Sequence, residues 1–500
     1  MKMKKLLILI LFIIFFVEFS FQENNFKLCE NGGISVLSDK CICPPSYSGD
    51  KCEKIDKNEK CTNATYFSNS IGPICCFSKY RDEINLSELK LTINNNKNNN
   101  NNSINLNKSY ENKIINELLK TYGPWDKKDV KLLDFLLISN LEKGEINLKY
   151  SNYFKKREQQ LENFLNNDNC NDLDNPNPLA FLLIIKDIDY DAINTLFQFL
   201  YSPNNYYLIH IDGNTKIDDE ELEIFFKKII ETKKENLSNY SKKKWNDYPS
   251  NIKIMKNRFE GEWGSISLVY LEIASYTVLF DMVEERINKT GLSFEDSQWS
   301  HIINLSGNDM PTIPLSNFSK ILCNNKRKSY LDHCCIKDYF RFDRNWVQLN
   351  DKSGLIELLP KNMKEQGCGD GLGMSKYYDR NKSYGDGSQW KFLNVEFVKY
   401  LISDLKSLER LISFKFSFIP DESFFQASKI FFNSKGGHSF EFDTKRVTMF
   451  DNNPEARDNT RYAVELKDIP NLHGLYFVRK VYLKEIRDAI IKEFNLLSEY

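Results

Sequence analysis

The chain has 500 residues, of which 41% are hydrophobic and 13% aromatic, and its formal net charge is −1. A single hydrophobic core stops growing at about 250–300 residues, so this length predicts two or three domains. The balanced charge argues against nucleic acid or an anionic membrane surface as the main partner, because either would call for a basic excess. Any basic binding site must therefore be local.

A short apolar segment opens the chain. Residues 1–5 (MKMKK) are basic, and residues 6–17 form an unbroken apolar run. This pattern is typical of a secretory signal, and the run is shorter than the about 20 residues that a membrane-spanning helix needs. No convincing cleavage site with small residues follows it. We therefore expect residues 1–22 to be either a cleaved signal peptide or an uncleaved signal anchor.

Cysteines are concentrated behind this leader, because seven of the 12 lie between Cys29 and Cys76. In an exported chain such density indicates disulfides, and the rival interpretation is a zinc site. With its four cysteines and its NGG turn, the segment 27–54 resembles the second half of an EGF-like module. The resemblance implies two local disulfides, which are Cys29–Cys41 and Cys43–Cys52.

The composition changes again before the C-terminal part of the chain. Residues 93–108 form an asparagine-rich tract that cannot bury apolar area, so we expect a disordered linker. Helical patterns follow at about residues 112–121 and 129–142, and a polar stretch comes after them. We expect residues 109–177 to be a helical stem and residues 178–495 to form the main domain.

From residue 178 onward, apolar runs typical of strands alternate with helical patterns. The expected strands are residues 179–185, 206–211, 252–255 and 299–305, and a long apolar helix is expected at about 265–286. This alternation predicts an α/β fold with a doubly wound, mostly parallel sheet. Ligands bind such sheets beyond the carboxyl ends of the strands, where this chain carries His210, Asp212 and Asp309.

Seven short segments of this domain stand out: residues 178–185 (PLAFLLII), 206–212 (YYLIHID), 263–268 (WGSISL), 303–309 (INLSGND), 387–390 (GSQW), 420–425 (PDESFF) and 476–480 (YFVRK). In this order they resemble the core-2/I-branching enzyme family, which groups branching β-1,6-N-acetylglucosaminyltransferases with peptide O-xylosyltransferases. The resemblance implies a GT-A-type Rossmann-like fold, a nucleotide-sugar donor, inversion at the sugar carbon and a Golgi-luminal setting. Residues 178–495 would then be the catalytic domain.

Inverting sugar transfer needs a carboxylate that takes the proton of the acceptor hydroxyl as the hydroxyl attacks. Glu422 begins an amphipathic segment just after Pro420. On the residues alone, it is better explained as a first-turn glutamate that favours the helix dipole. The resemblance implies that Glu422 is the catalytic base.

The resemblance also implies that basic side chains, rather than a divalent metal, bind the nucleotide diphosphate. Lys480 matches the lysine of the family's C-terminal signature, and Arg461 is matched to its second basic contact. A guanidinium fork and a lysine point charge both suit a diphosphate, although each residue could be an ordinary surface charge. The Asp187-Ile-Asp189 sequence lies at a helix start, where aspartate caps backbone N–H groups. We therefore expect no metal cofactor.

The remaining expected contacts belong to the donor and the acceptor. The resemblance implies that Asp212 accepts hydrogen bonds from uracil or ribose, beside His210, which is alternatively a buried supporting residue. Asp309 either orients the sugar or makes a turn after its strand. Xylosyltransferases carry an aspartate where this chain has Gln389, which cannot act as a base. Trp390 is expected to be a stacking surface for the acceptor.

We therefore expect an inverting glycosyltransferase that moves N-acetylglucosamine from UDP-N-acetylglucosamine (UDP-GlcNAc) to a glycan or glycoprotein hydroxyl. Its expected location is the Golgi membrane with a luminal catalytic domain, or outside the cell if the leader is cleaved. The enzyme alternative is transfer of xylose from UDP-xylose to a peptide serine. An exported EGF-bearing adhesion or lectin-like protein that has lost activity is the third interpretation.

Overall fold

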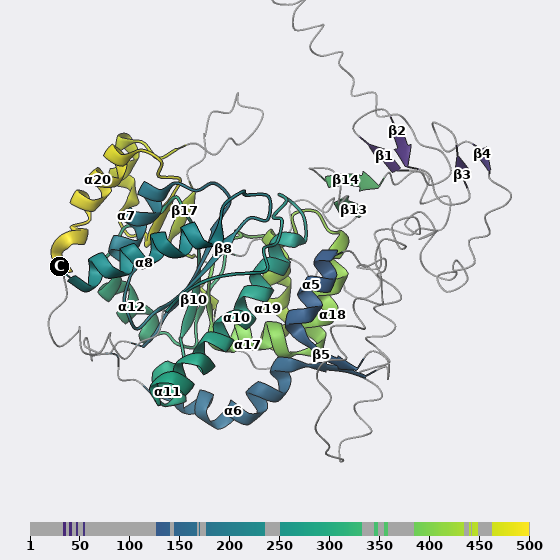
Figure 1. Ribbon diagram of the computed structural model, residues 1–500, viewed down its shortest axis with the longest axis horizontal. Helices are drawn as coiled ribbons and strands as arrows, with labels where there is room; N and C mark the ends of the chain where they lie inside the picture. Colours follow the sequence, from purple (N-terminus) through teal and green to yellow (C-terminus); the bar gives the residue numbers. More distant parts are fainter. Residues whose placement is uncertain are drawn as a thin grey trace, which may run out of the picture. The chain divides into compact units, whose positions relative to one another are not determined.

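The computed structural model in Figure 1 contains two compact units, residues 1–84 with 342–373 and residues 85–341 with 374–500. The structure describes residues 127–140, 145–167, 170, 177–235, 251–332, 385–434, 440–441, 443–448 and 463–499, together with short strands in the first unit. Each unit is described by itself.

In the first unit, the described backbone forms two-stranded antiparallel sheets. The pairs are β1 (Ile34–Val36) with β2 (Lys40–Ile42), β3 (Tyr47–Ser48) with β4 (Lys54–Ile55), and β13 (Asn345–Gln348) with β14 (Leu355–Leu358). The side chains of the four cysteines predicted to pair, the leader 1–22 and the tract 93–108 lie outside the described residues. The EGF-like module and its disulfides therefore stay predictions.

A seven-stranded sheet forms the centre of the second unit, in the order β16-β12-β15-β10-β7-β8-β9. The strands are β7 (Ala180–Ile185), β8 (Tyr206–Ile211), β9 (Ile252–Ile254), β10 (His301–Ser306), β12 (Ser329–Tyr330), β15 (Phe392–Asn394) and β16 (Phe440–Glu441). Strands β10, β7, β8 and β9 are parallel, whereas β15 is antiparallel to both β10 and β12. The predicted α/β fold with a mostly parallel sheet is confirmed.

Helices cover both faces of this sheet. Helices α7 (Tyr190–Leu200) and α8 (Asp219–Glu235) lead outward from β7 to β9, and α10 (Ser267–Thr290) leads back to β10. Parallel crossovers are right-handed, so α10 must lie on the face opposite α7 and α8. Figure 1 shows α8 and α12 (Leu315–Cys323) on one side of β8 and β10, with α10 and α17 (Val395–Ser403) on the other.

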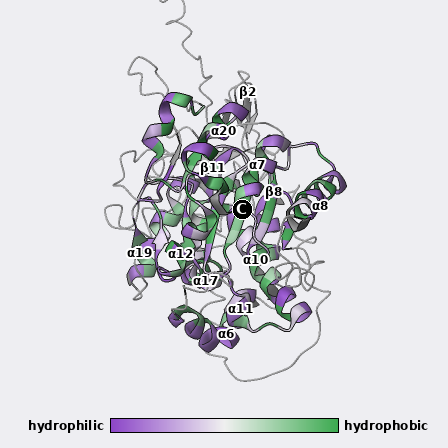
Figure 2. Ribbon diagram, turned by 90° about the vertical axis from the view of Figure 1, so that its left-hand side faces the viewer, coloured by the Kyte–Doolittle hydropathy of each residue, from purple (hydrophilic) through white to green (hydrophobic). Residues whose placement is uncertain are grey.

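The central strands are mostly apolar because both faces of the sheet are covered by helices. All six residues of β8 are buried, and much of the strand is green in Figure 2, where α6 (Lys149–Asn166) is mostly purple. One core cluster joins β7 and β8 to α7, α8 and α12. Within it the rings of Phe181 and Tyr207 stack on neighbouring strands with their centres 5.3 Å apart.

Two helices upstream of the sheet belong to the same unit. Helix α5 (Lys127–Leu136) is shorter than the predicted 129–142, because β5 (Leu137–Asn140) begins a hairpin with β6 (Glu145–Leu148). The polar stretch after residue 150 begins as helix α6, which lies against α10. The Tyr150 hydroxyl donates to Asp281 at 2.8 Å, and the Tyr153 hydroxyl donates to Glu284 at 2.9 Å. Among the described residues, no helix is both long and apolar enough to cross a membrane.

The C-terminal part of the unit adds a small sheet and several helices. The sheet has the order β11 (Asp309–Pro311), β18 (Phe477–Arg479) and β17 (Arg446–Thr448). The helical elements are α11 (Phe294–Ser297), α18 (Leu405–Ser413), η5 (Phe414–Phe416), η6 (Pro420–Glu422), α19 (Phe424–Ser434), η7 (Leu466–Leu472), α20 (Lys484–Glu493) and η8 (Leu496–Glu499). Strand β18 is antiparallel to β11, which directly follows β10.

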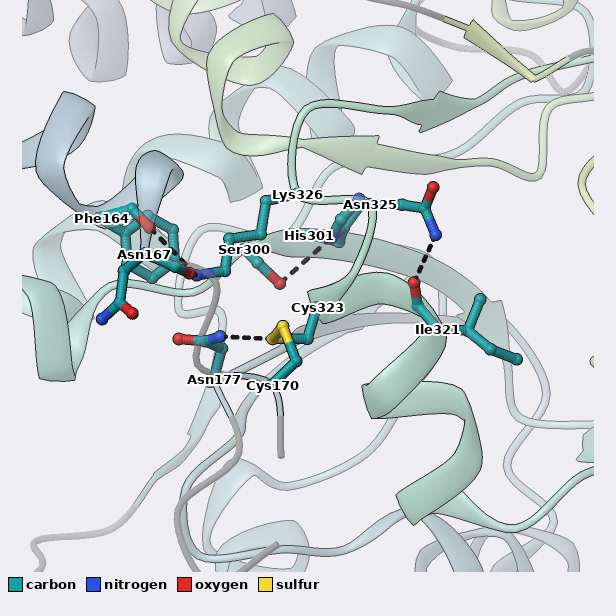
Figure 3. Close-up of a disulfide and its surroundings, with 10 residues drawn as sticks. All are labelled: Phe164, Asn167, Cys170, Asn177, Ser300, His301, Ile321, Cys323, Asn325 and Lys326. Carbon is teal, nitrogen blue, oxygen red and sulfur yellow. Dashed lines mark hydrogen bonds between the residues drawn. A yellow bond between two sulfur atoms is a disulfide. The ribbon is translucent and has the colours of Figure 1, made fainter. Parts of the chain in front are cut away.

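A disulfide between Cys170 and Cys323 joins the segment after α6 to the end of α12 (Figure 3). The Asn177 amide donates to the Cys323 sulfur at 2.8 Å, and the Lys326 ammonium donates to the Phe164 carbonyl at 3.1 Å. Sequence analysis assigned neither cysteine a partner. The two are 153 residues apart, so no local spacing indicates the pair.

Candidate active site at the carboxyl edge of the sheet

The sheet has its topological switch point between β7 and β10, since the chain continues from β7 to β8 on one side and returns to β10 on the other. In doubly wound sheets the ligand crevice lies outside the carboxyl ends of the strands at this point. Five of the predicted site residues follow the strands or segments that meet at this edge: Asp212, Asp309, Gln389, Glu422 and Lys480.

The end of β8 is tied to the loop that precedes α10. The Asp212 carboxylate, only 5% exposed, accepts from the backbone N–H of Asn214 at 2.9 Å and of Gly261 at 2.8 Å. His210 is 1% exposed, and its Nε2 accepts from the Phe259 N–H at 3.0 Å. Burial lowers the pKa of His210 to about 4, so the ring is neutral. This placement matches the alternative of a buried supporting residue for His210, not a donor contact.

The loop before α10 also contacts the turn that carries Glu422. The Ile419 N–H donates to the Gly264 carbonyl at 2.9 Å, and Gly264 has a φ of 81°, which favours glycine. Trp263 is 57% exposed and meets Phe418 edge-on, with ring centres 5.5 Å apart. The segments 263–268 and 420–425 therefore meet in space.

Glu422 ends η6 and is half-buried, directly before α19. Its carbonyl accepts from the Gly387 N–H at 2.8 Å, which brings the segment 387–390 beside it. Gly387 is required there, because a Cβ would lie 1.9 Å from the carbonyl oxygen of Asp332. The buried Phe424 and Phe425 fix the start of α19. The geometry thus holds Glu422 between the loop that precedes α10 and the segment of Gln389 and Trp390.

Gln389 and Trp390 differ in their surroundings. Gln389 is half-buried, and its carbonyl accepts from the Lys391 ammonium at 2.7 Å. Trp390 is only 6% exposed, and the guanidinium carbons of Arg446 and Arg479 lie 4.2 and 4.6 Å from its ring centre. The two arginines therefore occupy the ring that was expected to stack on the acceptor. The role of Trp390 as a stacking surface for the acceptor stays a prediction.

Asp309 is held by protein groups on both of its carboxylate oxygens. Its Oδ1 lies 2.6 Å from Nη2 of Arg446, and its Oδ2 accepts from the backbone N–H and the hydroxyl of Ser306, each at 2.6 Å. Of the two interpretations of Asp309, the turn after the strand matches these contacts. Contact with the sugar would require the carboxylate to leave Arg446.

Lys480 directly follows β18, and its backbone lies beside the turn that follows β10. Its carbonyl accepts from the Val464 N–H at 2.9 Å, and the next N–H, of Val481, donates to the Asn308 carbonyl at 2.9 Å. The side chain is half-buried, and among the described residues no ion pair engages its ammonium. Arg461, the second basic residue predicted to bind the diphosphate, lies outside the described residues.

The capping interpretation of the Asp187-Ile-Asp189 sequence is confirmed for Asp189, which accepts from the Ala192 N–H at 3.0 Å at the start of α7. Within the described ranges, no group of three or more His, Cys, Asp and Glu side chains could hold a metal ion.

Sequence analysis missed a buried charged network beside Glu422. The Lys391 ammonium lies 2.6 Å from Oε2 of Glu272, and both side chains are fully buried. The same oxygen accepts from the Tyr276 hydroxyl at 2.9 Å and from the Asn304 amide at 2.7 Å. One signal was present, because Glu272 interrupts an otherwise apolar stretch of the expected long helix.

Comparisons with known proteins agree with the geometry. The model of the family described as "Core-2/I-Branching enzyme" matches residues 282–472. Xylosyltransferase oxt of Drosophila pseudoobscura pseudoobscura is 24% identical over 295 residues, which cover 57% of this chain and 28% of that protein. Xylosyltransferase sqv-6 of Caenorhabditis elegans is 28% identical over 157 residues, which cover 31% of this chain and 16% of that protein. The chain thus matches less than a third of the length of either relative. Residues 282–472 thus match a glycosyltransferase domain of the core-2/I-branching enzyme family.

Proposed function

We propose that this chain transfers a sugar from a UDP-sugar to an acceptor hydroxyl with inversion, and that Glu422 is the general base. The observation that carries this proposal is the position of Glu422, which is half-buried between two anchored segments. Ile419 ties its turn to the loop that binds Asp212, and Gly387 ties it to the segment of Gln389. A carboxylate held in this way at the ligand edge of the sheet suits proton abstraction from an incoming hydroxyl.

Lys480 completes the proposed chemistry. As the glycosidic bond to the nucleotide breaks, negative charge develops on the diphosphate, and a fixed cation stabilises it. The Lys480 backbone is bonded on both sides of the residue, to Val464 and through Val481 to Asn308. We propose that this lysine, together with Arg461, binds the diphosphate in place of a divalent metal.

Xylose is the first candidate for the transferred sugar. The two relatives described above carry the name xylosyltransferase, and this supports UDP-xylose as the donor and a peptide serine as the acceptor. One residue favours a second candidate, because Gln389 stands where xylosyltransferases carry an aspartate. UDP-GlcNAc with a glycan hydroxyl as the acceptor therefore remains the second candidate.

We propose the lumen of the secretory pathway, and within it the Golgi, as the location. The basic and apolar leader supports export, and the Cys170–Cys323 disulfide is of the kind that persists in oxidising compartments.

The test is a UDP-release assay on the purified chain with UDP-xylose, UDP-GlcNAc, UDP-glucose and UDP-galactose, each with a serine peptide or a glycan acceptor. We expect turnover with one of the first two donors. Glu422→Gln should lower the acceptor-dependent rate by about 10²–10⁴-fold while UDP affinity stays within a few-fold of wild type. Glu485→Gln, on the exposed first turn of α20, is the matched control and should be fully active.

Two outcomes would contradict the proposal in different ways. Turnover with none of the UDP-sugars would reject the proposed activity and favour a binding protein that has lost catalysis. A Glu422→Gln chain as active as wild type would leave the activity in place but move the base to another residue.

A further inference from the structure

We propose that Asp421 is a positioning residue whose buried charge increases the basicity of its neighbour Glu422, with the Lys391–Glu272 pair holding the two segments together. This inference rests on the proposed function of Glu422. It assigns no contact with substrate to Asp421.

The Asp421 side chain is only 3% exposed, although it adjoins the half-buried Glu422 on η6. Among the described residues, its Oδ1 has no hydrogen-bond partner. Burying a carboxylate without donors on each oxygen is costly, so a purely structural position would favour an apolar or amide side chain. A role for the charge itself accounts for an aspartate at this position.

Lys391 joins the three elements that enclose this carboxylate. Its ammonium donates to the Gln389 carbonyl at 2.7 Å, pairs with Glu272 of α10 at 2.6 Å, and lies 3.6 Å from the ring centre of Phe425 in α19. Burial raises the pKa of the Glu272 carboxyl, whereas three donors on one of its oxygens oppose this shift and favour the ionised form. The opposite charges of Lys391 and Glu272 then offset each other, and Asp421 adds a further negative charge next to Glu422.

The charged groups that act on Asp421 come from each side of it. Glu422 lies on its own turn, Glu272 on α10, and Lys391 at the start of β15. Helix α19 carries Lys429, and burial lowers the pKa of this lysine to about 8. Burial first, and then the charges of Glu422 and Glu272, raise the pKa of Asp421 to about 7.

The coupling between the two carboxylates is reciprocal, because Glu422 disfavours a charge on Asp421 as much as Asp421 disfavours one on Glu422. Above about pH 7, Asp421 is charged, and Glu422 binds a proton more tightly and is the better base. Below that pH, Asp421 is neutral and this assistance is lost. The transfer rate should therefore rise through an inflection near pH 7 that belongs to the carboxylate pair.

The experiment is the pH profile of kcat between pH 5 and 9 for the full chain, with saturating donor and acceptor. Wild type should show the inflection near pH 7, and Asp421→Asn should lack it. Above pH 8 the variant should be slower by at most about tenfold, because only the strength of the base has changed. Asp129→Asn is the matched control, since it changes another buried carboxylate, which pairs with Lys415 at 2.5 Å. It should keep the inflection.

If Asp421→Asn does not fold, a second variant still tests the inference. Lys391→Met removes a cation that favours the charged form of Asp421, so the inflection should move to higher pH. An inflection that persists unchanged in Asp421→Asn, or that stays in place in Lys391→Met, would overturn the inference and leave the proposed activity intact. A wild-type chain that turns over no UDP-sugar would instead overturn both.

Discussion

Arg446 and Asp309 form a buried ion pair, with Nη2 of the arginine 2.6 Å and its Nε 2.9 Å from Oδ1 of the aspartate. The pair joins β17 to the start of β11, directly after the end of β10. Because Arg446 also lies over Trp390, the same contact orders one wall of the candidate site. Burial lowers the pKa of Arg446 to about 10, still well above neutral pH, so the guanidinium stays charged.

Asp309→Ala should therefore destabilise the fold strongly. Removing one partner of a buried pair leaves the other charge uncompensated, at a cost of about 3–5 kcal/mol. The measurement is urea denaturation of wild type and variant. Asp488→Asn breaks the exposed pair with Lys484 on α20 and should cost no more than about 1 kcal/mol. If both variants lost the same free energy of unfolding, burial would not make the Arg446–Asp309 pair more stabilising than an exposed pair.

The Cys170–Cys323 disulfide should make a large contribution to stability. It closes a loop of 153 residues, and loss of a native disulfide typically costs about 2–5 kcal/mol. The double variant Cys170→Ser/Cys323→Ser, which leaves no free thiol at the site, should show this loss in urea denaturation. Wild type in dithiothreitol should approach the same midpoint. A double variant as stable as oxidised wild type would mean that the bond does not constrain the unfolded chain.

His210 should make the fold less stable in acid. Its folded-state pKa is about 4 and its unfolded value about 6.5, so between these pH values only the unfolded chain binds the proton. Stability from this group is complete above about pH 6.5 and is lost as the pH falls towards 4, by up to about 1.4 kcal/mol per pH unit.

The variant that tests this is His210→Gln, whose side-chain oxygen can still accept from the Phe259 N–H. Denaturation at pH 7.5, 6.5, 5.5 and 5 should give a shallower loss of stability than in wild type. Asp421 has a raised pKa, so its protonation makes the folded state more stable as the pH falls over this range. Because Asp421 is present in both chains, its effect cancels in the comparison. Parallel pH dependences in the two chains would contradict a buried neutral His210.

Strands β7, β8 and β10 could be predicted because each is a mostly apolar run that is buried along almost its whole length. Strands β12 and β15 could not, since two or three residues give no periodic pattern. Helix α6 was missed because charged and amide side chains dominate its sequence. Its buried residues, Tyr150, Phe154, Leu161, Phe164 and Leu165, nevertheless recur at helical spacing.

The motifs located Glu422 and Lys480, because local sequence determines where each segment begins and ends. They could not locate the partners of these segments. Asp309 and Arg446 are 137 residues apart, and only the sheet order β11-β18-β17 brings them together. The same limit applies to Lys391 and Glu272. For this reason sequence analysis left a sugar contact and a turn open for Asp309 and did not predict that Asp309 and Trp390 both contact arginines.

Lys480 should affect donor binding and chemistry together. Its charge meets the bound diphosphate and also the charge that develops on the leaving group, so both the ground state and the transition state lose an interaction. Lys480→Ala should weaken UDP binding and lower kcat by about 10²–10³-fold. In Glu422→Gln, by contrast, only the rate should fall. Calorimetric titration with UDP and acceptor-dependent UDP release measure the two effects.

Two controls separate this role from general charge loss and from metal catalysis. Lys484→Ala removes an exposed lysine four residues further on, which pairs with Asp488 on the surface, and it should leave both values unchanged. Wild-type turnover should persist in excess EDTA, because a chelator removes a bound metal ion but not the charge of a lysine side chain. Loss of turnover that manganese restores, with UDP affinity unaffected by Lys480→Ala, would show that a metal ion binds the diphosphate instead.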